Sequence, residues 1–123
     1  MYQIRKEFSF EAAHKLTTLH PEHKCMRLHG HSYRVEVVIK CSELDKHSFI
    51  TDFSNLRFVK NYLKEYVDHR YLNEVFEFET TAENLAFHFY KWIKGQVAVT
   101  LKRDFTCEVI VWETAKSYAK YWE

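Results

Sequence analysis

The sequence predicts an α+β domain in which a four-stranded antiparallel sheet carries two helices on one face. Segments in which polar and apolar residues alternate come in two pairs, one near each end of the chain, and two segments with helical periodicity lie between them. The length of 123 residues fits a single domain, residues 1–123, with one core. The aromatic content of 17% supplies large side chains that need such a core.

The first two predicted strands lie on the N-terminal side of the helices. Residues 2–14 alternate, with Phe8 and Phe10 on the apolar side, and we expect a strand over this range. A second alternating strand is expected to begin near His29. The connection between them, residues 15–28, is long for so small a domain, which is more typical of a functional loop than of a simple turn.

The first predicted helix covers residues 54–67, where apolar residues recur at helical spacing. Asp52 or Ser54 is its candidate N-terminal cap, because a short polar side chain can accept hydrogen bonds from the free N–H groups of the first turn. The segment that follows, "DHRYLNE" at residues 68–74, is expected to be a turn.

The second predicted helix opens with Thr80 and Glu83, which have the spacing of a capping box. Gly95 could end this helix, but apolar residues continue the same stripe to about residue 100. We therefore favour a long helix that contains the glycine at a modest cost in stability.

The last two predicted strands cover residues 106–113 and the C-terminal segment "SYAKYWE". A sheet of this kind leaves its edge strands unpaired, and an unpaired edge can pair with another chain. We therefore expect the protein to form an oligomer.

The composition argues against several classes of function. Lysine and arginine number 18 and aspartate and glutamate 17, so a net charge of +1 gives no overall basic field for nucleic acid. No stretch approaches the ~20 apolar residues of a membrane helix, and no secretory signal is expected. The scattered Cys25, Cys41 and Cys107 indicate reduced thiols and a cytoplasmic protein. Cys41 and Cys107 lie in apolar stretches, which favours small buried side chains.

Histidines around residue 30 indicate a metal site. His29 and His31 project from the same face of the predicted second strand, and Gly30 between them removes bulk. If the first two strands form a hairpin, His14 lies close to both, and three imidazoles converge. Three neutral histidines with a vacant fourth position suit a catalytic zinc ion. A chance group of solvated loop histidines remains the alternative.

Other residues could complete such a site. Cys25 stands among basic residues shortly before the histidines, where its thiolate would be favoured, and it is a candidate base, nucleophile or fourth ligand. His20 and His23 lie in the same loop and compete as ligands, but they stand in an irregular polar segment and need no metal to explain them. Asp68 next to His69 could orient an imidazole for proton transfer, or form an ordinary surface turn.

Glu113 continues the apolar side of the predicted strand 106–113. A carboxylate in that place must emerge at the end of the strand or meet a specific partner. A buried ligand rich in N–H donors is one such partner.

Six motifs in order resemble those of the 6-pyruvoyltetrahydropterin synthase family: "FEAAH", "CMRLHGHSY", "DF", "DHRYLN", "TAEN" and "WET". The resemblance extends from about Phe8 to Thr114, nearly the whole chain. The short spacing from Cys25 to His29 is similar to that of the bacterial branch that makes 6-carboxytetrahydropterin in queuosine biosynthesis. The family usually has proline where Thr80 stands and glycine near Ser48.

The resemblance implies the T-fold, in which subunits join their sheets into a barrel, usually a homohexamer of two stacked trimers with active sites between subunits. It implies a zinc-dependent lyase that converts 7,8-dihydroneopterin triphosphate to 6-carboxy-5,6,7,8-tetrahydropterin, releasing acetaldehyde and triphosphate. A 6-pyruvoyltetrahydropterin synthase or a related lyase on the same substrate is the alternative. The implied site comprises the zinc ligands His14, His29 and His31, the catalytic residues Cys25, Asp68 and His69, and the substrate-binding residues Glu113, Thr81 and Glu83.

Overall fold

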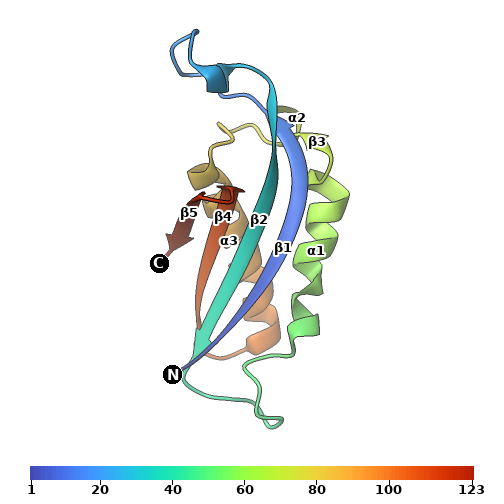
Figure 1. The fold of residues 1–123 in the computed structure, drawn as a ribbon. Coiled ribbons are helices and arrows are strands. Elements are labelled where there is room, and N and C mark those ends of the chain that lie inside the picture. Colours follow the sequence, from blue (N-terminus) through green and yellow to red (C-terminus); the bar gives the residue numbers. More distant parts are fainter.

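The strands of the protein form one mixed sheet, and helices cover one of its faces (Figure 1). The computed structural model describes all residues from 1 to 123. Along the sheet the order is β3-β1-β2-β4-β5. The bounds are β1 (Tyr2–His14), β2 (His29–Cys41), β3 (Arg70–Tyr71), β4 (Thr106–Thr114) and β5 (Ser117–Trp122). The predicted α+β class and all four predicted strands are confirmed.

A fifth strand, β3, makes the predicted four-stranded antiparallel sheet incorrect. β3 pairs in parallel with β1, through Ala12 with Arg70 and Ala13 with Tyr71. Its two residues are too few to give an alternating pattern, so periodicity could not reveal it. It covers only the C-terminal end of β1 and leaves residues 2–11 of that strand unpaired on this side.

β1 and β2 form a long antiparallel hairpin whose register brings the histidines together. His14 lies opposite His29, and Ala12 lies opposite His31. Residues opposite one another in an antiparallel pair project from the same face. The three histidines therefore share the face that also carries the buried Phe8.

The segment predicted as one helix over residues 54–67 contains three kinds of helical turn. A 3₁₀ turn (Phe53–Leu56) leads into α1 (Arg57–Tyr62), which continues as a π-helical turn (Leu63–Val67). The predicted cap is present, since the Asp52 side chain accepts a hydrogen bond from the Ser54 N–H at 2.8 Å. At the other end the widened turn is closed by the Asp68 N–H, which donates to the Leu63 carbonyl at 2.7 Å.

Hydrogen bonds to β1 account for the widened turn. The Asp68 carboxylate accepts a hydrogen bond from the Glu11 N–H at 2.8 Å, and the His69 N–H donates to the Glu11 carbonyl. These bonds tie the end of the helical segment to the edge of β1. The segment predicted as a turn after it contains β3 and then a short helix, α2 (Leu72–Val75).

The long helix predicted near the C-terminus is confirmed as α3 (Ala82–Leu101). It continues through Gly95 and ends at Lys102, which has left-handed backbone geometry with φ of 54°. The predicted cap is wrong by one residue. Thr81, not Thr80, accepts the hydrogen bond from the Asn84 N–H, because Thr80 is buried against His14.

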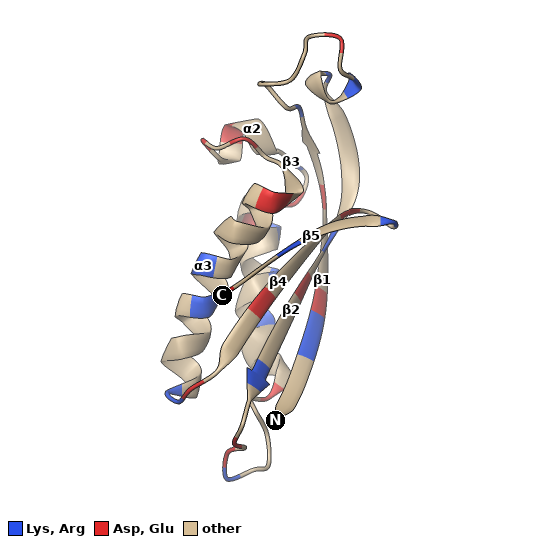
Figure 2. Ribbon diagram, turned by 90° about the vertical axis from the view of Figure 1, so that its left-hand side faces the viewer, with Lys and Arg blue, Asp and Glu red and all other residues tan.

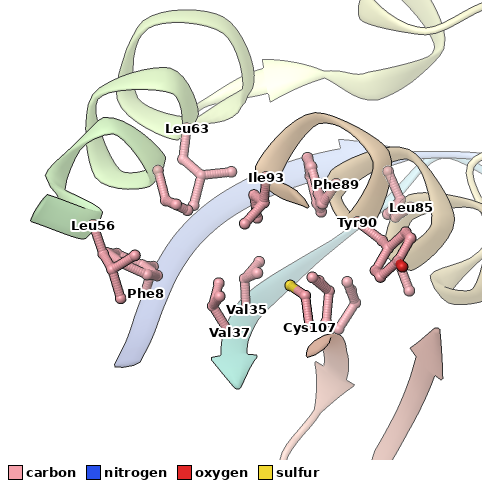
Figure 3. Packing of buried hydrophobic residues seen from close by; sticks show 14 of the residues in the cluster. Phe8, Val35, Val37, Leu56, Leu63, Leu85, Phe89, Tyr90, Ile93 and Cys107 are labelled. Atoms are coloured by element: carbon pink, nitrogen blue, oxygen red, sulfur yellow. The ribbon is translucent and has the colours of Figure 1, made fainter. Parts of the chain in front are cut away.

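The core lies between the sheet and the helices (Figure 3). Leu56 and Leu63 from the α1 side and Phe89 from α3 point toward side chains of the sheet such as Val35. The cluster contains 25 buried residues. Cys41 and Cys107 are also buried there, as the apolar pattern around them predicts.

Charged side chains occur on the strands as well as on the helices (Figure 2). On the helix-free face of the sheet, Glu108 in β4 forms ion pairs of 2.9 Å with both Lys40 and Lys120. Glu36 similarly pairs with Arg5 at 2.9 Å. None of the helices is both long enough and apolar enough to cross a lipid bilayer.

Replacing Gly95 with alanine is expected to stabilise the protein. Gly95 is exposed in the interior of α3, and a Cβ atom added there would meet nothing within 4 Å. Alanine loses less backbone entropy in a helix, which is worth about 1 kcal/mol. Urea unfolding should show a higher midpoint for Gly95→Ala, with Gln96→Ala, at the neighbouring exposed position, as the control. A lower midpoint for Gly95→Ala would contradict the open environment of this residue.

Candidate functional site

Three imidazoles converge at one end of the β1–β2 hairpin. The ring centroids of His14 and His29 lie 4.7 Å apart, those of His29 and His31 4.9 Å, and those of His14 and His31 5.2 Å. One nitrogen of each ring lies within 4.8 Å of the corresponding nitrogens of the other two. This group could hold a metal ion.

Backbone carbonyl groups fix the tautomers of two of these histidines. Nδ1 of His14 lies 3.0 Å from the Thr80 carbonyl oxygen, and Nδ1 of His29 lies 2.6 Å from the Arg27 carbonyl oxygen. A carbonyl oxygen only accepts hydrogen bonds, so each Nδ1 must carry the hydrogen and donate it. Each Nε2 then keeps its lone pair, which is the arrangement that metal-binding histidines adopt.

His31 supplies the third nitrogen. Its Nε2 is buried and has no hydrogen-bond partner, with the nearest carboxylate oxygen, Oε1 of Glu113, 3.5 Å away. An unsatisfied buried nitrogen is costly, and a metal ion would satisfy it. Three nitrogen donors therefore fit zinc, which binds neutral imidazoles and can keep a fourth position open.

The protonation states favour metal binding. Burial, followed by the neighbouring His29 and His31, lowers the pKa of His14 to about 4. Burial is also the main cause that lowers the pKa of His31, against the opposing charge of Glu113. Both rings are therefore neutral near pH 7, and neutral imidazole is the form that binds metals.

Gly30 does not serve the purpose that the sequence suggested. Its position alternates to the face opposite His29 and His31, so it makes no room between their rings. A Cβ atom added there would form only an ordinary contact, 3.5 Å from the Ala12 carbonyl oxygen.

Replacing Thr80 with valine is expected to weaken metal binding about tenfold, because partners of a ligating histidine orient its ring. The Thr80 hydroxyl lies 3.0 Å from Nδ1 of His14 and is a second acceptor for its hydrogen beside the Thr80 carbonyl. Thr80→Ser keeps the hydroxyl and should bind as the wild type does. Competition with a chromophoric chelator measures the affinity, and equal values for the wild type and Thr80→Val would show that the carbonyl suffices.

Glu113 forms one wall of a cavity of about 220 Å³ beside the histidines. The cavity also contains Thr81 and Glu83 at the start of α3, so the structure brings together the three residues predicted to bind substrate. The full lining is Leu16, Thr81, Ala82, Glu83, Glu113, Ser117 and Tyr118. A ligand in this cavity would lie between the start of α3, the end of β4 and the first residues of the 15–28 loop.

Cys25 lies in a 3₁₀ turn (Lys24–Met26) of that loop and is half-buried. Its carbonyl accepts a hydrogen bond from the Leu16 N–H at 2.8 Å, so the loop folds back just beyond the paired ends of β1 and β2. His23 caps this turn by accepting from the Cys25 N–H at 3.1 Å. His20 accepts from the Glu22 N–H in the same way, and neither histidine joins the metal-binding group.

Asp68 and His69 lie elsewhere in the chain. Oδ2 of Asp68 is 2.9 Å from Nδ1 of His69, whose side chain is 77% exposed. His69 lines a cavity of about 520 Å³ together with Glu11 and Ser32, which project from the face of the sheet opposite the three histidines. No hydrogen bond or ion pair joins this pair to Cys25 within the chain.

Two residues that the sequence did not single out hold the Cys25 loop in place. The Asn73 side chain bonds both backbone groups of Lys15, accepting from its N–H at 3.1 Å and donating to its carbonyl at 2.9 Å. Glu79 accepts hydrogen bonds from the Thr17 N–H at 3.0 Å and from the Thr18 hydroxyl at 2.9 Å. Only the three-dimensional structure brings residues so distant in sequence together.

Tyr33 is a further residue whose position the sequence did not mark as functional. It is fully buried on the core face of β2, and its hydroxyl lies 3.4 Å from Nε2 of His14. Burial, followed by the charge of Glu113, raises the pKa of Tyr33. In the sequence it was indistinguishable from the other apolar residues of the strand.

Known proteins resemble the chain over nearly its full length. The family model described as "6-pyruvoyl tetrahydropterin synthase" matches residues 3–123. The 6-carboxy-5,6,7,8-tetrahydropterin synthase of Synechocystis is 37% identical, over 98% of this chain and 93% of the relative. The enzyme of the same name from Aquifex aeolicus is 30% identical, over 99% and 98%.

The fold is similar to that of a solved relative. The 6-pyruvoyl tetrahydropterin synthase of Caenorhabditis elegans superimposes with a TM-score of 0.82 at 26% identity, covering 99% of this chain and 95% of that one. Sequence and fold therefore agree with the family that the ordered motifs indicate. The chain belongs to the 6-pyruvoyl tetrahydropterin synthase family.

Proposed function

We propose that the protein is a zinc-dependent lyase that converts 7,8-dihydroneopterin triphosphate to 6-carboxy-5,6,7,8-tetrahydropterin, with release of acetaldehyde and triphosphate, on the way to queuosine. The observation that carries the proposal is the group of three imidazoles beside the Glu113 cavity. The two bacterial relatives named for this product, together with the short spacing from Cys25 to His29, favour this branch of the family.

In this proposal His14, His29 and His31 hold the zinc ion. When bound, zinc acts as a Lewis acid toward side-chain oxygens of the substrate, which makes the adjacent C–H bonds more acidic. The chain would hold the ion through three imidazoles, two of which are oriented by backbone carbonyl groups.

The pterin ring is proposed to occupy the Glu113 cavity. The Glu113 carboxylate can accept paired hydrogen bonds from the amino group and ring N–H of a pterin, an arrangement that orients the ring. Thr81 and Glu83, at the N-terminus of α3, line the same cavity. A ring held here would direct its substituent toward His31, which neighbours Glu113.

Cys25 is the proposed acid–base thiol, and Asp68 with His69 form the proposed second proton carrier. A thiolate held in the loop above the hairpin can take a proton from the substrate side chain. Asp68 orients His69 through the 2.9 Å contact, and the exposed His69 lies on the other face of the sheet. We therefore assign the Asp68 and His69 that complete each site to a neighbouring subunit.

The assembly proposed for this arrangement is a hexamer of two stacked trimers, each subunit being one T-fold domain. The unpaired part of β1 and the outer side of β5 lie at the two lateral edges of the sheet. Edge strands of neighbouring subunits can pair with them there. A barrel closed in this way has no free edges.

A 6-pyruvoyltetrahydropterin synthase is the second candidate, favoured by the likeness to the enzyme of Caenorhabditis elegans. Incubation of the zinc-loaded protein with 7,8-dihydroneopterin triphosphate, followed by mass spectrometry, separates the two. We expect 6-carboxytetrahydropterin with equimolar acetaldehyde. A pyruvoyl pterin without acetaldehyde would support the second candidate, and an unconsumed substrate would reject both.

A further inference from the structure

Tyr33 packs against two of the three histidines, His14 and His31. It follows His31 by two positions on β2 and therefore projects from the same face. Its ring stacks on Phe10 with centroids 4.7 Å apart and an interplanar angle of 10°. The His14 and His31 rings lie nearly perpendicular to it, at centroid distances of 6.1 and 5.4 Å. The phenol therefore has no freedom to turn away from the histidines.

The Tyr33 hydroxyl makes one hydrogen-bond contact within the chain, with Nε2 of His14 at 3.4 Å. Because Nδ1 of His14 donates its hydrogen to the Thr80 carbonyl, Nε2 keeps a free lone pair that can bind a metal ion. Once it binds a metal ion, it can no longer accept a hydrogen bond from Tyr33. The hydroxyl would then be buried without a partner, which folded proteins avoid because of its cost.

The chain offers the hydroxyl no other hydrogen bond. The partner that remains is a ligand at the open position of the metal site. We propose that Tyr33 donates a hydrogen bond to the substrate side-chain oxygen that completes this site. The inference rests on the proposed function. It adds a catalytic residue, which contacts the substrate from the core face of β2. The ligand class is a pterin whose substituent carries a hydroxyl or carbonyl oxygen.

Such a donor would act mainly during the reaction. A hydroxyl group held in place by stacking and burial is already oriented when negative charge develops on the substrate oxygen. Its removal should lower kcat roughly 100-fold, as for other preorganised donors to a developing oxyanion, and raise KM by no more than the roughly fivefold effect of one ground-state hydrogen bond.

The test is Tyr33→Phe, which removes only the hydroxyl and keeps the ring stacked on Phe10. Tyr90→Phe is the matched control, because Tyr90 is another buried tyrosine and contacts Tyr121, not the histidines. Thermal unfolding and zinc affinity, measured by chelator competition, should match the wild type in both variants. Turnover should fall only in Tyr33→Phe.

A binding measurement separates this inference from the proposed function. Neopterin carries side-chain hydroxyls and 6-methylpterin carries none, and both are fluorescent probes. Tyr33→Phe should bind neopterin about fivefold more weakly in the zinc-loaded form, the effect of one hydrogen bond, and 6-methylpterin unchanged. An inactive wild type with this pattern would reject the proposed reaction and keep the role of Tyr33.

Two results would overturn the inference. Unchanged kcat together with unchanged neopterin binding in Tyr33→Phe would leave the hydroxyl with a purely structural role. A loss of zinc affinity as large as that of a histidine variant would show that the phenol oxygen is itself a metal ligand.

Discussion

Cys25→Ala is expected to lose turnover by roughly 100-fold or more, the range that a general acid or base contributes, while fold and metal content remain those of the wild type. The thiol lies in a half-buried turn of the 15–28 loop and is not one of the three imidazoles that form the metal-binding group. Its loss would therefore remove the proposed proton acceptor without disturbing either the core or the group of three histidines. Steady-state kinetics on dihydroneopterin triphosphate and metal analysis of the purified variant measure both effects.

Glu22→Ala is the control for this experiment, because Glu22 is exposed in the same loop and its hydrogen bond to His20 comes from its backbone N–H. It should turn over at close to the wild-type rate. A fully active Cys25→Ala protein would remove the thiol from the mechanism, whereas an inactive Glu22→Ala protein would point to the loop as a whole.

His31→Ala is expected to lose both metal and activity. Its Nε2 is the buried nitrogen without a partner, and alanine leaves only His14 and His29 to hold an ion. We expect metal affinity to fall by more than the roughly 100-fold upper limit seen when only a supporting residue is lost. Saturating zinc should raise the melting temperature of the wild type, since a ligand at 100 times its dissociation constant adds about 2.7 kcal/mol of stability.

The same addition should leave the melting temperature of His31→Ala unchanged. His47→Ala controls for the loss of a histidine as such, because His47 lies in the exposed loop after β2 and is not part of the metal-binding group. A metal-free wild type that shows no response to zinc, cobalt or manganese would contradict a metal role for the histidines.

The elements that the sequence predicted best are those with many residues in one pattern. β1, β2 and α3 each repeat their pattern over several turns or alternations, so single exceptions such as Gly95 do not change the outcome. β3 has two residues and exists because Asp68 and His69 attach the preceding turn to Glu11. A contact between distant segments of this kind leaves no local pattern.

The same distinction applies to the site. The proximity of the three histidines followed from strand alternation and from the hairpin, which are local rules. Thr80 illustrates where such rules fail, since its capping-box spacing was correct but its side chain contacts His14. The positions of Asn73 and Glu79 depend on packing between the loop and the segment before α3, which one sequence cannot reveal.

Three consecutive residues before α3 each have a separate task. Glu79 holds the Cys25 loop, Thr80 holds His14, and Thr81 caps the helix and lines the Glu113 cavity. The position of this tripeptide along the chain is therefore constrained by all three roles at once. One inserted residue would put the loop, His14 and the cavity out of alignment together, whereas the mostly exposed 42–48 connection at the other end of the sheet has room to vary in length.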